Sequence, residues 1–264
     1  MEDESTAEGA ASNSATETAA ETKGDETKGD ETKGDETKGD ETKGDEVSSI
    51  VRMAEARMNA SNDLKHIALA VHNQHSVFKQ FPDPALRDAE NNKLLSWRVA
   101  ILPYLGESEL YEKFHLDESW DSPHNMTLLE QIPEQYVTQE ANVETGHTLY
   151  LAPINVEPPS PDSPRLAWVA DGPSKMRDFL DGTSNTILIV ETNQSNSVPW
   201  TKPDDLMVDL SNPSEIIGDV FQGGSHMVMA DGAVLFITNN IDSEVLKALL
   251  TRANKETISP EDFR

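Results

Sequence analysis

The first ordered segment of the chain is marked by apolar residues spaced three and four positions apart. They stand at positions 47, 50, 54, 64, 67, 68 and 71. This spacing places apolar side chains on one face of an α-helix. It predicts one long amphipathic helix over residues 47–78, which Pro82 and Pro84 end. Ser, Asn and Asp at 59–63 compete for backbone hydrogen bonds, so any break in the helix is expected there.

A second helical pattern is followed by strand-like runs. Large apolar residues at 94, 97, 101 and 105 predict a helix that stops at Gly106, and Ser108 is a candidate N-cap for a short helix through Phe114. From about residue 148 the pattern changes to short apolar runs separated by Pro-rich loops. These runs predict strands over 148–151, 166–170 and 186–190.

The strongest local signal is the dipeptide Asp231-Gly232 between two apolar runs. A type I′ turn requires positive φ at both central residues, which Asp and Gly tolerate best, so residues 223–237 are predicted to form a tight hairpin. Both faces of this hairpin are largely apolar, which predicts cover on both sides. The expected cross-strand pairs are Ala230–Ala233, Met229–Val234, Val228–Leu235 and Met227–Phe236.

The chain closes on a third helical segment. Asp242 or Ser243 is expected to cap a last helix over residues 244–252, which has acidic residues near its start and basic residues near its end. The predicted class is α+β: a long N-terminal amphipathic helix packed on an antiparallel β-sheet, with a short C-terminal helix.

Composition separates the first 46 residues from the rest. Residues 21–45 are five copies of Glu-Thr-Lys-Gly-Asp, and no aromatic or large aliphatic residue stands between Glu2 and Glu46. Such a segment cannot bury enough apolar area to offset the entropy of ordering it. We therefore expect a disordered acidic tail over 1–46 and one folded domain over 47–264. The tail is interpreted as a solvated spacer, with weak divalent-cation binding or docking as alternatives.

Charge and cysteine content exclude several functions. The chain has 48 acidic and 21 basic residues, a net charge of −27, which disfavours nucleic acid and anionic membranes as partners. It has no cysteine, so thiol catalysis, Cys-ligated zinc and disulfides are excluded. The N-terminus lacks the features of a signal peptide, and no apolar run has the roughly 20 residues of a membrane span. The chain as written is expected to be soluble, although its compartment is not specified.

One loop carries oxygen donors of the kind that calcium accepts. It runs from Asp181 through Gly182 to Asn185 and leads into a strand that ends near Glu191. Together with Asp231, these residues are the candidate Ca²⁺ ligands. The alternative is that their side chains cap turn and strand-entry backbone groups. His72 and His75 share a helix face, but a two-His spacing alone is weak evidence for a metal site.

Other notable residues are interpreted as structural. Trp97 is expected in the core, and Trp200 is expected to anchor its loop. Trp120 is expected to be buried, with hydrogen bonds fixing the loop around it. Gly182, Gly223, Gly224 and Gly232 are likewise interpreted as structural positions, with Gly232 in the hairpin turn. No Gly-x-Ser-x-Gly elbow, Walker loop, His-Glu-x-x-His pair or dinucleotide fingerprint occurs. The protein is therefore predicted not to be an enzyme.

Seven segments, in order, coincide with those of one family. They are 62–73, 96–105, 120–125, 181–187, 200–206, 230–234 and 246–252. Residues 47–264 thereby resemble a large planctomycete family of unknown function, domain of unknown function 1559, with a prepilin-type N-terminus and an H-X9-DG signature. The resemblance implies a pseudopilin-like head and an exported or cell-envelope protein. Its pilin-like members open with a membrane-spanning apolar half-helix, which residues 47–78 do not include.

The hairpin departs from the family signature at one position. The histidine ten residues before the Asp-Gly is Phe221 here, and the nearest imidazole, His226, lies five residues before it. A ligand role of the family histidine therefore does not carry over to Phe221. The expected function is a non-enzymatic structural or interaction protein, with protein partners or self-association. The alternative is a calcium- or small-ligand-binding module of solute-binding type.

Overall fold

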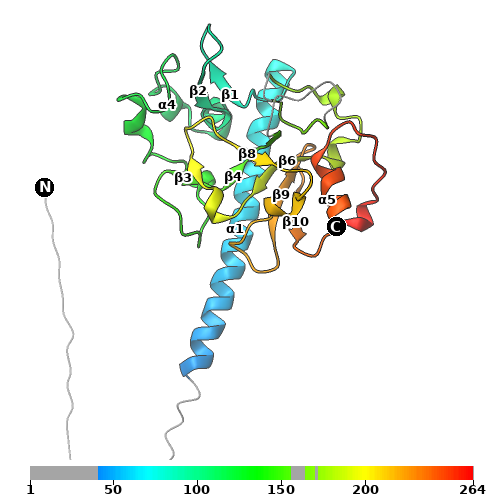
Figure 1. The fold of residues 1–264 in the computed structure, drawn as a ribbon. Coiled ribbons are helices and arrows are strands. Elements are labelled where there is room, and N and C mark those ends of the chain that lie inside the picture. The colour runs from blue at the N-terminus through cyan, green and yellow to red at the C-terminus, as the bar shows by residue number, and fades with distance from the viewer. Residues whose placement is uncertain (1–40, 156–163, 170–171, 264) are drawn as a thin grey trace, which may run out of the picture. The chain divides into compact units, whose positions relative to one another are not determined.

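The computed structural model describes residues 41–155, 164–169 and 172–263, and within 41–46 only the backbone. Of the tail predicted over residues 1–46, residues 1–40 lie outside the described residues, and residues 41–46 are helical rather than disordered. The fold is α+β, as predicted: an N-terminal helix, several small sheets and a short C-terminal helix, shown in Figure 1. Within the described residues, no helix has the length and apolar character needed to cross a bilayer.

The predicted long helix is α1, Glu41–Phe78. It begins before Val47 and passes without interruption through 59–63, where a break was expected. Its C-terminal half buries Leu64, Ile67 and Val71 completely. Burial of this face supplies the stabilisation that the sequence of 59–63 lacks, because tertiary packing outweighs weak local propensity.

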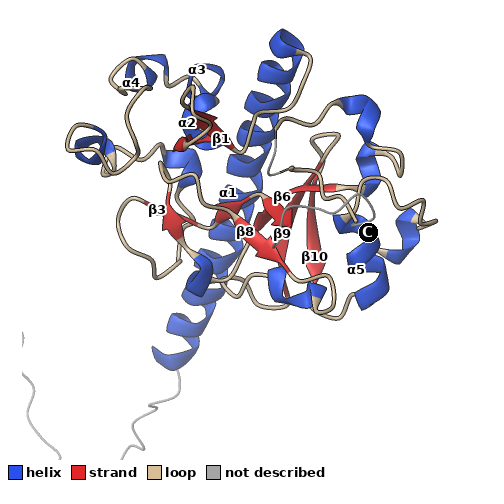
Figure 2. Ribbon diagram, turned by 45° about the horizontal axis from the view of Figure 1, so that its top comes forward, coloured by secondary structure: helices blue, strands red, loops and turns tan. Residues whose placement is uncertain are grey.

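A four-stranded antiparallel sheet carries the centre of the fold. Its strands lie in the order β10-β9-β6-β4, with bounds Val234–Thr238, Gly224–Met229, Ile187–Glu191 and Tyr150–Leu151. Figure 2 shows β6, β9 and β10 side by side. Three two-stranded sheets surround it: β1 (Ala85–Arg87) with β2 (Lys93–Ser96), β3 (His147–Thr148) with β7 (Val198–Pro199), and β5 (Pro153–Asn155) with β8 (Leu206–Val208).

Both faces of the central sheet are covered, as the hairpin pattern predicted. Val228 of β9 packs in the cluster that contains the buried face of α1. Met227 and Met229, which alternate with it, pack in a second cluster with Leu246 of the C-terminal helix α5, Ser243–Leu250. The Asp242 carboxylate caps α5 by accepting from the Glu244 and Val245 amides, which confirms the predicted cap.

The hairpin exists, but its predicted turn type and register are wrong. Val234 pairs with Val228, and Phe236 pairs with His226, one residue out of the expected register. The Met229 carbonyl accepts from the Gly232 amide, and Gly232 alone in the turn has positive φ, at 90°. This is a three-residue loop with a type I turn and a left-handed glycine, rather than a type I′ turn. A one-residue slip reverses which face each side chain occupies.

Three further predictions are corrected. The predicted helix over 94–105 is strand β2 followed by α2 (Trp97–Ala100) and α3 (Leu102–Leu105), with α4 at Ser108–Tyr111. Ser96 causes the break, because its hydroxyl accepts from the Arg98 amide and starts a new helix. Of the strand predicted over 166–170, the described residues 166–169 form isolated bridges instead, through Leu166 with Thr251 and Val169 with Gly172. Glu107, rather than Ser108, is the N-cap residue of α4.

Candidate functional site: a row of side chains beneath the N-terminal helix

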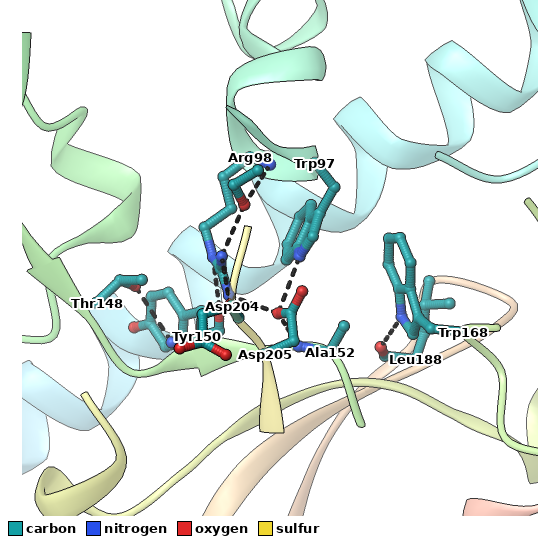
Figure 3. Close-up of polar contacts among 10 residues, drawn as sticks. Trp97, Arg98, Thr148, Tyr150, Ala152, Trp168, Leu188, Asp204 and Asp205 are labelled. Atoms are coloured by element: carbon teal, nitrogen blue, oxygen red, sulfur yellow. Dashed lines mark hydrogen bonds and ion pairs between the residues drawn. The ribbon is translucent and has the colours of Figure 1, made fainter. Parts of the chain in front are cut away.

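The most extensive buried polar network joins two of the segments that carry the family resemblance. The Arg98 guanidinium lies 2.7 Å from Oδ1 of Asp205, and the two side chains are 0% and 2% exposed. The same oxygen accepts from the Trp97 indole N–H and from the Ala152 amide. Figure 3 shows these groups converging, with Trp168 close to the Trp97 ring.

This network is built to hold the fold. Arg98 also donates to the Tyr150 carbonyl and the Ser96 hydroxyl, so its fork of donors is used within the protein. Burial raises the pKa of Asp205, and the nearby Arg98 guanidinium opposes that rise. Trp97 is fully buried, as predicted. Because the donors and acceptors of this network are paired with other groups of the chain, the network does not offer a ligand site.

The predicted calcium loop likewise uses its side chains to fix the chain. The Asp181 carboxylate oxygens accept from the Asn254 and Lys255 amides and so tie down the C-terminal segment. Asn185 donates to the Asp181 carbonyl. Gly182 has φ of 98°, a conformation that favours glycine and bends the chain into this loop.

The four predicted ligands do not meet at one place. The Asp231 amide donates to the Thr183 carbonyl, which brings the hairpin turn beside the Asp181 loop, and the Asp231 carboxylate accepts from the Ala233 amide within its own turn. Glu191 is the last residue of β6, at the end of the strand away from the Asp181 loop. Within the described residues, no three His, Cys, Asp or Glu side chains form a group that could hold a metal ion. Calcium binding stays a prediction without an assembled site.

The other tryptophans and loop residues have local structural partners. Trp200 is fully buried and donates to the Leu129 carbonyl, which confirms it as an anchor. Trp120 is only half-buried, and its ring lies 5.7 Å from the Lys202 ammonium. Asn125 organises this loop by donating to the carbonyls of His115 and Ser119.

One row of side chains crosses the central sheet on the face that α1 covers. Tyr150 of β4 pairs with Glu191 of β6, and His226 of β9 pairs with Phe236 of β10. Glu191 and His226 complete the row, because the Glu191 carboxylate lies 2.7 Å from Nδ1 of His226. Sequence reasoning named Glu191 and His226 separately and missed their pairing, which depends on the register between two strands far apart in sequence.

Glu191 and His226 form a buried, hydrogen-bonded pair. The same Glu191 oxygen accepts from the His226 amide, and the carboxylate is 0% exposed. Because this oxygen acts as an acceptor for Nδ1, the proton of a neutral imidazole belongs on Nδ1, which leaves Nε2 as an acceptor. Phe221 and Phe236 flank the imidazole edge to face, at centroid distances of 5.6 and 5.1 Å.

Two adjoining grooves run along α1, one beside this row and the other beside Phe221 and Gln222. One, of about 470 Å³, is lined by Ala54, Arg57, Met58, Ser61, Asn62, Lys65, His226, Val234 and Phe236. The other, of about 410 Å³, is lined by Ser49, Ile50, Met53, Ala54, Arg57, Phe221 and Gln222. Arg57 belongs to both, and its guanidinium carbon lies 3.4 Å from the centre of the Phe236 ring. The grooves place His226 beside solvent-accessible basic side chains of α1.

His72 and His75 do not extend this site. Burial lowers the pKa of both, with a further contribution from the neighbouring His75 at His72 and from Lys79 at His75. His72 packs against the hairpin turn, where a Cβ at Gly232 would lie 3.3 Å from its ring. His75 stacks near Phe81, at a centroid distance of 5.0 Å. They act as packing residues at the C-terminal end of α1.

The carboxyl group of Asp63 on α1 has a shifted pKa, so the stability of the fold depends on pH through this residue. Burial raises its pKa from 3.8 to about 6; His66 opposes the rise and Glu134 adds to it. The folded state therefore favours the protonated form, and this contribution is lost as the pH rises from about 4 to 6. Asp63→Asn is expected to stabilise the fold at about pH 7.5 by on the order of 1 kcal/mol, a figure reduced for screening at this half-exposed side chain.

Urea denaturation at the two ends of this pH range checks the expectation. At about pH 3.5, where Asp63 is protonated in the folded state and mostly protonated in the unfolded state, the variant and the parent protein should have nearly the same free energy of unfolding. Asp117→Asn, at an exposed position, is the matched charge control. A destabilised Asp63 variant at about pH 7.5 would contradict the account.

Comparison with known families places the chain in one of them. The family described as a protein of unknown function (DUF1559), with the short name SBP_bac_10, matches residues 51–214. This is more than half of the chain, and the protein belongs to that family. The expected family is confirmed, whereas its planctomycete origin, prepilin-type N-terminus and H-X9-DG signature stay predictions. A search of curated proteins gave no match, and a search of solved structures gave none either.

Proposed function

We propose that the protein is a non-enzymatic, pseudopilin-like interaction module that associates with a second copy of itself through α1. The observation that carries this proposal is a stripe of exposed apolar residues on the N-terminal half of the helix. Val47, Ile50, Val51 and Met58 are 50–63% exposed. In Figure 1 these turns extend beyond the strands of the sheet. A soluble protein seldom exposes such a surface without a partner.

The stripe has the spacing of a helix–helix seam. Positions 47, 51, 54 and 58 recur at alternating intervals of four and three, the repeat of a coiled coil. At 100° per residue, this stripe faces away from Ala56 and Ala60, which are buried against the head. A second α1 is therefore the partner whose surface matches, because the same seam is self-complementary in a two-fold dimer.

The catalytic alternative lacks an assembled site. Glu191 and His226 resemble the carboxylate and imidazole of a hydrolase, yet within the described residues no hydroxyl is hydrogen-bonded to the free ring nitrogen. Ser184, a hydroxyl in this part of the sheet, lies in the 3₁₀ turn Thr183–Asn185 that precedes β6, whereas Glu191 is the last residue of that strand. This separation supports a protein without a hydrolase triad.

Sedimentation equilibrium over a range of protein concentrations tests self-association. The chain is expected to shift from monomer to dimer with increasing concentration, and the double variant Val47→Lys, Val51→Lys is expected to remain monomeric. Val77→Lys is the control, since Val77 is 61% exposed at the other end of the same helix. A monomer at every concentration up to about 1 mM, the regime of a very weak complex, would rule the proposal out.

Ligand binding is the second candidate function. The family short name SBP_bac_10 suggests a relation to solute-binding proteins. The groove of about 470 Å³ beside His226 favours this candidate, because it lies within the size range of small-molecule sites. Val47 and Val51 do not line it, so the two candidate functions can be tested by separate substitutions.

A further inference from the structure

The two grooves along α1 differ in charge from the protein as a whole. Acidic residues outnumber basic ones by 48 to 21 in the chain. The groove linings nevertheless contain Arg57, Lys65 and His226 and no Asp or Glu. A basic concavity on a strongly acidic protein concentrates small anions, because the local field there opposes that of the surrounding surface.

The basic groups in the groove are not committed to acidic partners. Within the described residues, neither Arg57 nor Lys65 forms an ion pair, whereas Arg52 on the same helix pairs with Glu140. Lys65 donates only to the Asn62 side chain, at 3.1 Å. The Arg57 guanidinium carbon lies over the Phe236 ring, 3.4 Å from its centre, a contact that uses none of the guanidinium N–H donors. A guanidinium held in this way suits bidentate contact with a carboxylate.

His226, which also lines the groove, adds a second requirement for the ligand, a hydrogen-bonding group that matches its ring nitrogen. It is 4% exposed, its Nδ1 faces Glu191, and it lines the groove. No described residue is hydrogen-bonded to Nε2, which in the neutral ring accepts a hydrogen bond. A ligand that meets the neutral ring at Nε2 would therefore donate to it through a hydroxyl or amine group. Met58, Val234 and Phe236 supply apolar walls for the carbon skeleton.

We infer that this groove binds small hydroxylated carboxylates, with Arg57 and Lys65 holding the carboxylate and Nε2 of His226 accepting from the hydroxyl. This inference deepens the second candidate function, ligand binding, and does not depend on self-association. The ordered Glu191 carboxylate acts as a positioning group, because it fixes the tautomer and orientation of His226.

Citrate and tricarballylate are the matched probes, because they differ only in the hydroxyl group. Isothermal titration calorimetry at low salt is expected to show citrate binding, with tricarballylate about tenfold weaker, the loss expected when a hydrogen bond is removed. Lys65→Gln is expected to weaken citrate binding about tenfold. Lys113→Gln, which removes the same charge at an exposed position outside the groove, should leave it unchanged.

The outcomes separate the inference from self-association. Absence of citrate binding overturns the inference, and sedimentation of the same sample shows independently whether α1 still associates. Equal affinities for the two probes would overturn the role of His226. Equal losses for the Lys65 and Lys113 variants would show a nonspecific charge effect and overturn the groove as the site. His226→Gln, with folding checked by circular dichroism, should abolish the preference for citrate.

Discussion

Replacing Arg98 with Met is expected to lower the free energy of unfolding by about 3–5 kcal/mol, because it leaves the Asp205 charge buried without its partner. The pair is only 0–2% exposed, so water cannot replace the lost guanidinium. The change also removes a donor from the Tyr150 carbonyl, which lies in the strand next to β6. Urea denaturation monitored by tryptophan fluorescence measures the loss.

Two matched variants make this expectation specific. Lys202→Met breaks the exposed ion pair with Asp204 and should cost less than about 1 kcal/mol, as exposed pairs do. Adding Asp205→Asn to Arg98→Met should recover much of the loss, because Asn still accepts from Trp97 and Ala152 without carrying a buried charge. An Arg98→Met loss no larger than that of Lys202→Met would contradict the structural role of the network.

Gly224→Ala is expected to destabilise the hairpin by about 3 kcal/mol, at the upper end of the cost of overpacking. A Cβ at Gly224 would collide with the carbonyl oxygen of Ile237. Gly224 is paired with Thr238 in the ladder, so the backbone cannot move away without breaking the pairing of β9 and β10. Thermal unfolding and amide hydrogen exchange of the hairpin measure the effect.

Gly223 provides the neighbouring control. A Cβ there meets nothing within 4 Å, although φ is 93°, so Gly223→Ala should cost only about 1–2 kcal/mol for the left-handed conformation. The difference between the two variants isolates the close strand approach at Gly224. Equal losses would assign the requirement for glycine to backbone conformation alone.

Several elements of the fold followed from local chemistry. The three-and-four spacing predicted α1 because one helical face had to be buried, and Asp242 predicted the start of α5 because a carboxylate there satisfies free amides. By contrast, residues 94–105 were assigned to a helix from apolar spacing. Leu95 instead pairs with Leu86 in a strand, and a short apolar run does not distinguish these outcomes.

The candidate site was less accessible to sequence analysis than the fold. Glu191 was proposed as a calcium ligand from its distance along the chain to Asp181. In the structure Asp181 lies in the loop before β6, whereas Glu191 is the last residue of that strand and pairs with His226. The Arg57–Phe236 contact also joins residues distant in sequence. Such pairings depend on strand register and helix rotation, which one sequence does not encode in any local pattern.

The hairpin over residues 223–237 separates the features that local sequence specifies from those that tertiary packing specifies. Its turn at Asp231-Gly232 and its need for cover on both faces follow from the sequence, since glycine tolerance and apolar alternation are local properties. Its register, and with it the position of His226 beside Glu191 under α1, follows from tertiary packing. The physical reason is that a one-residue slip leaves local propensity unchanged while exchanging the two faces, so packing against α1 and α5 selects between them.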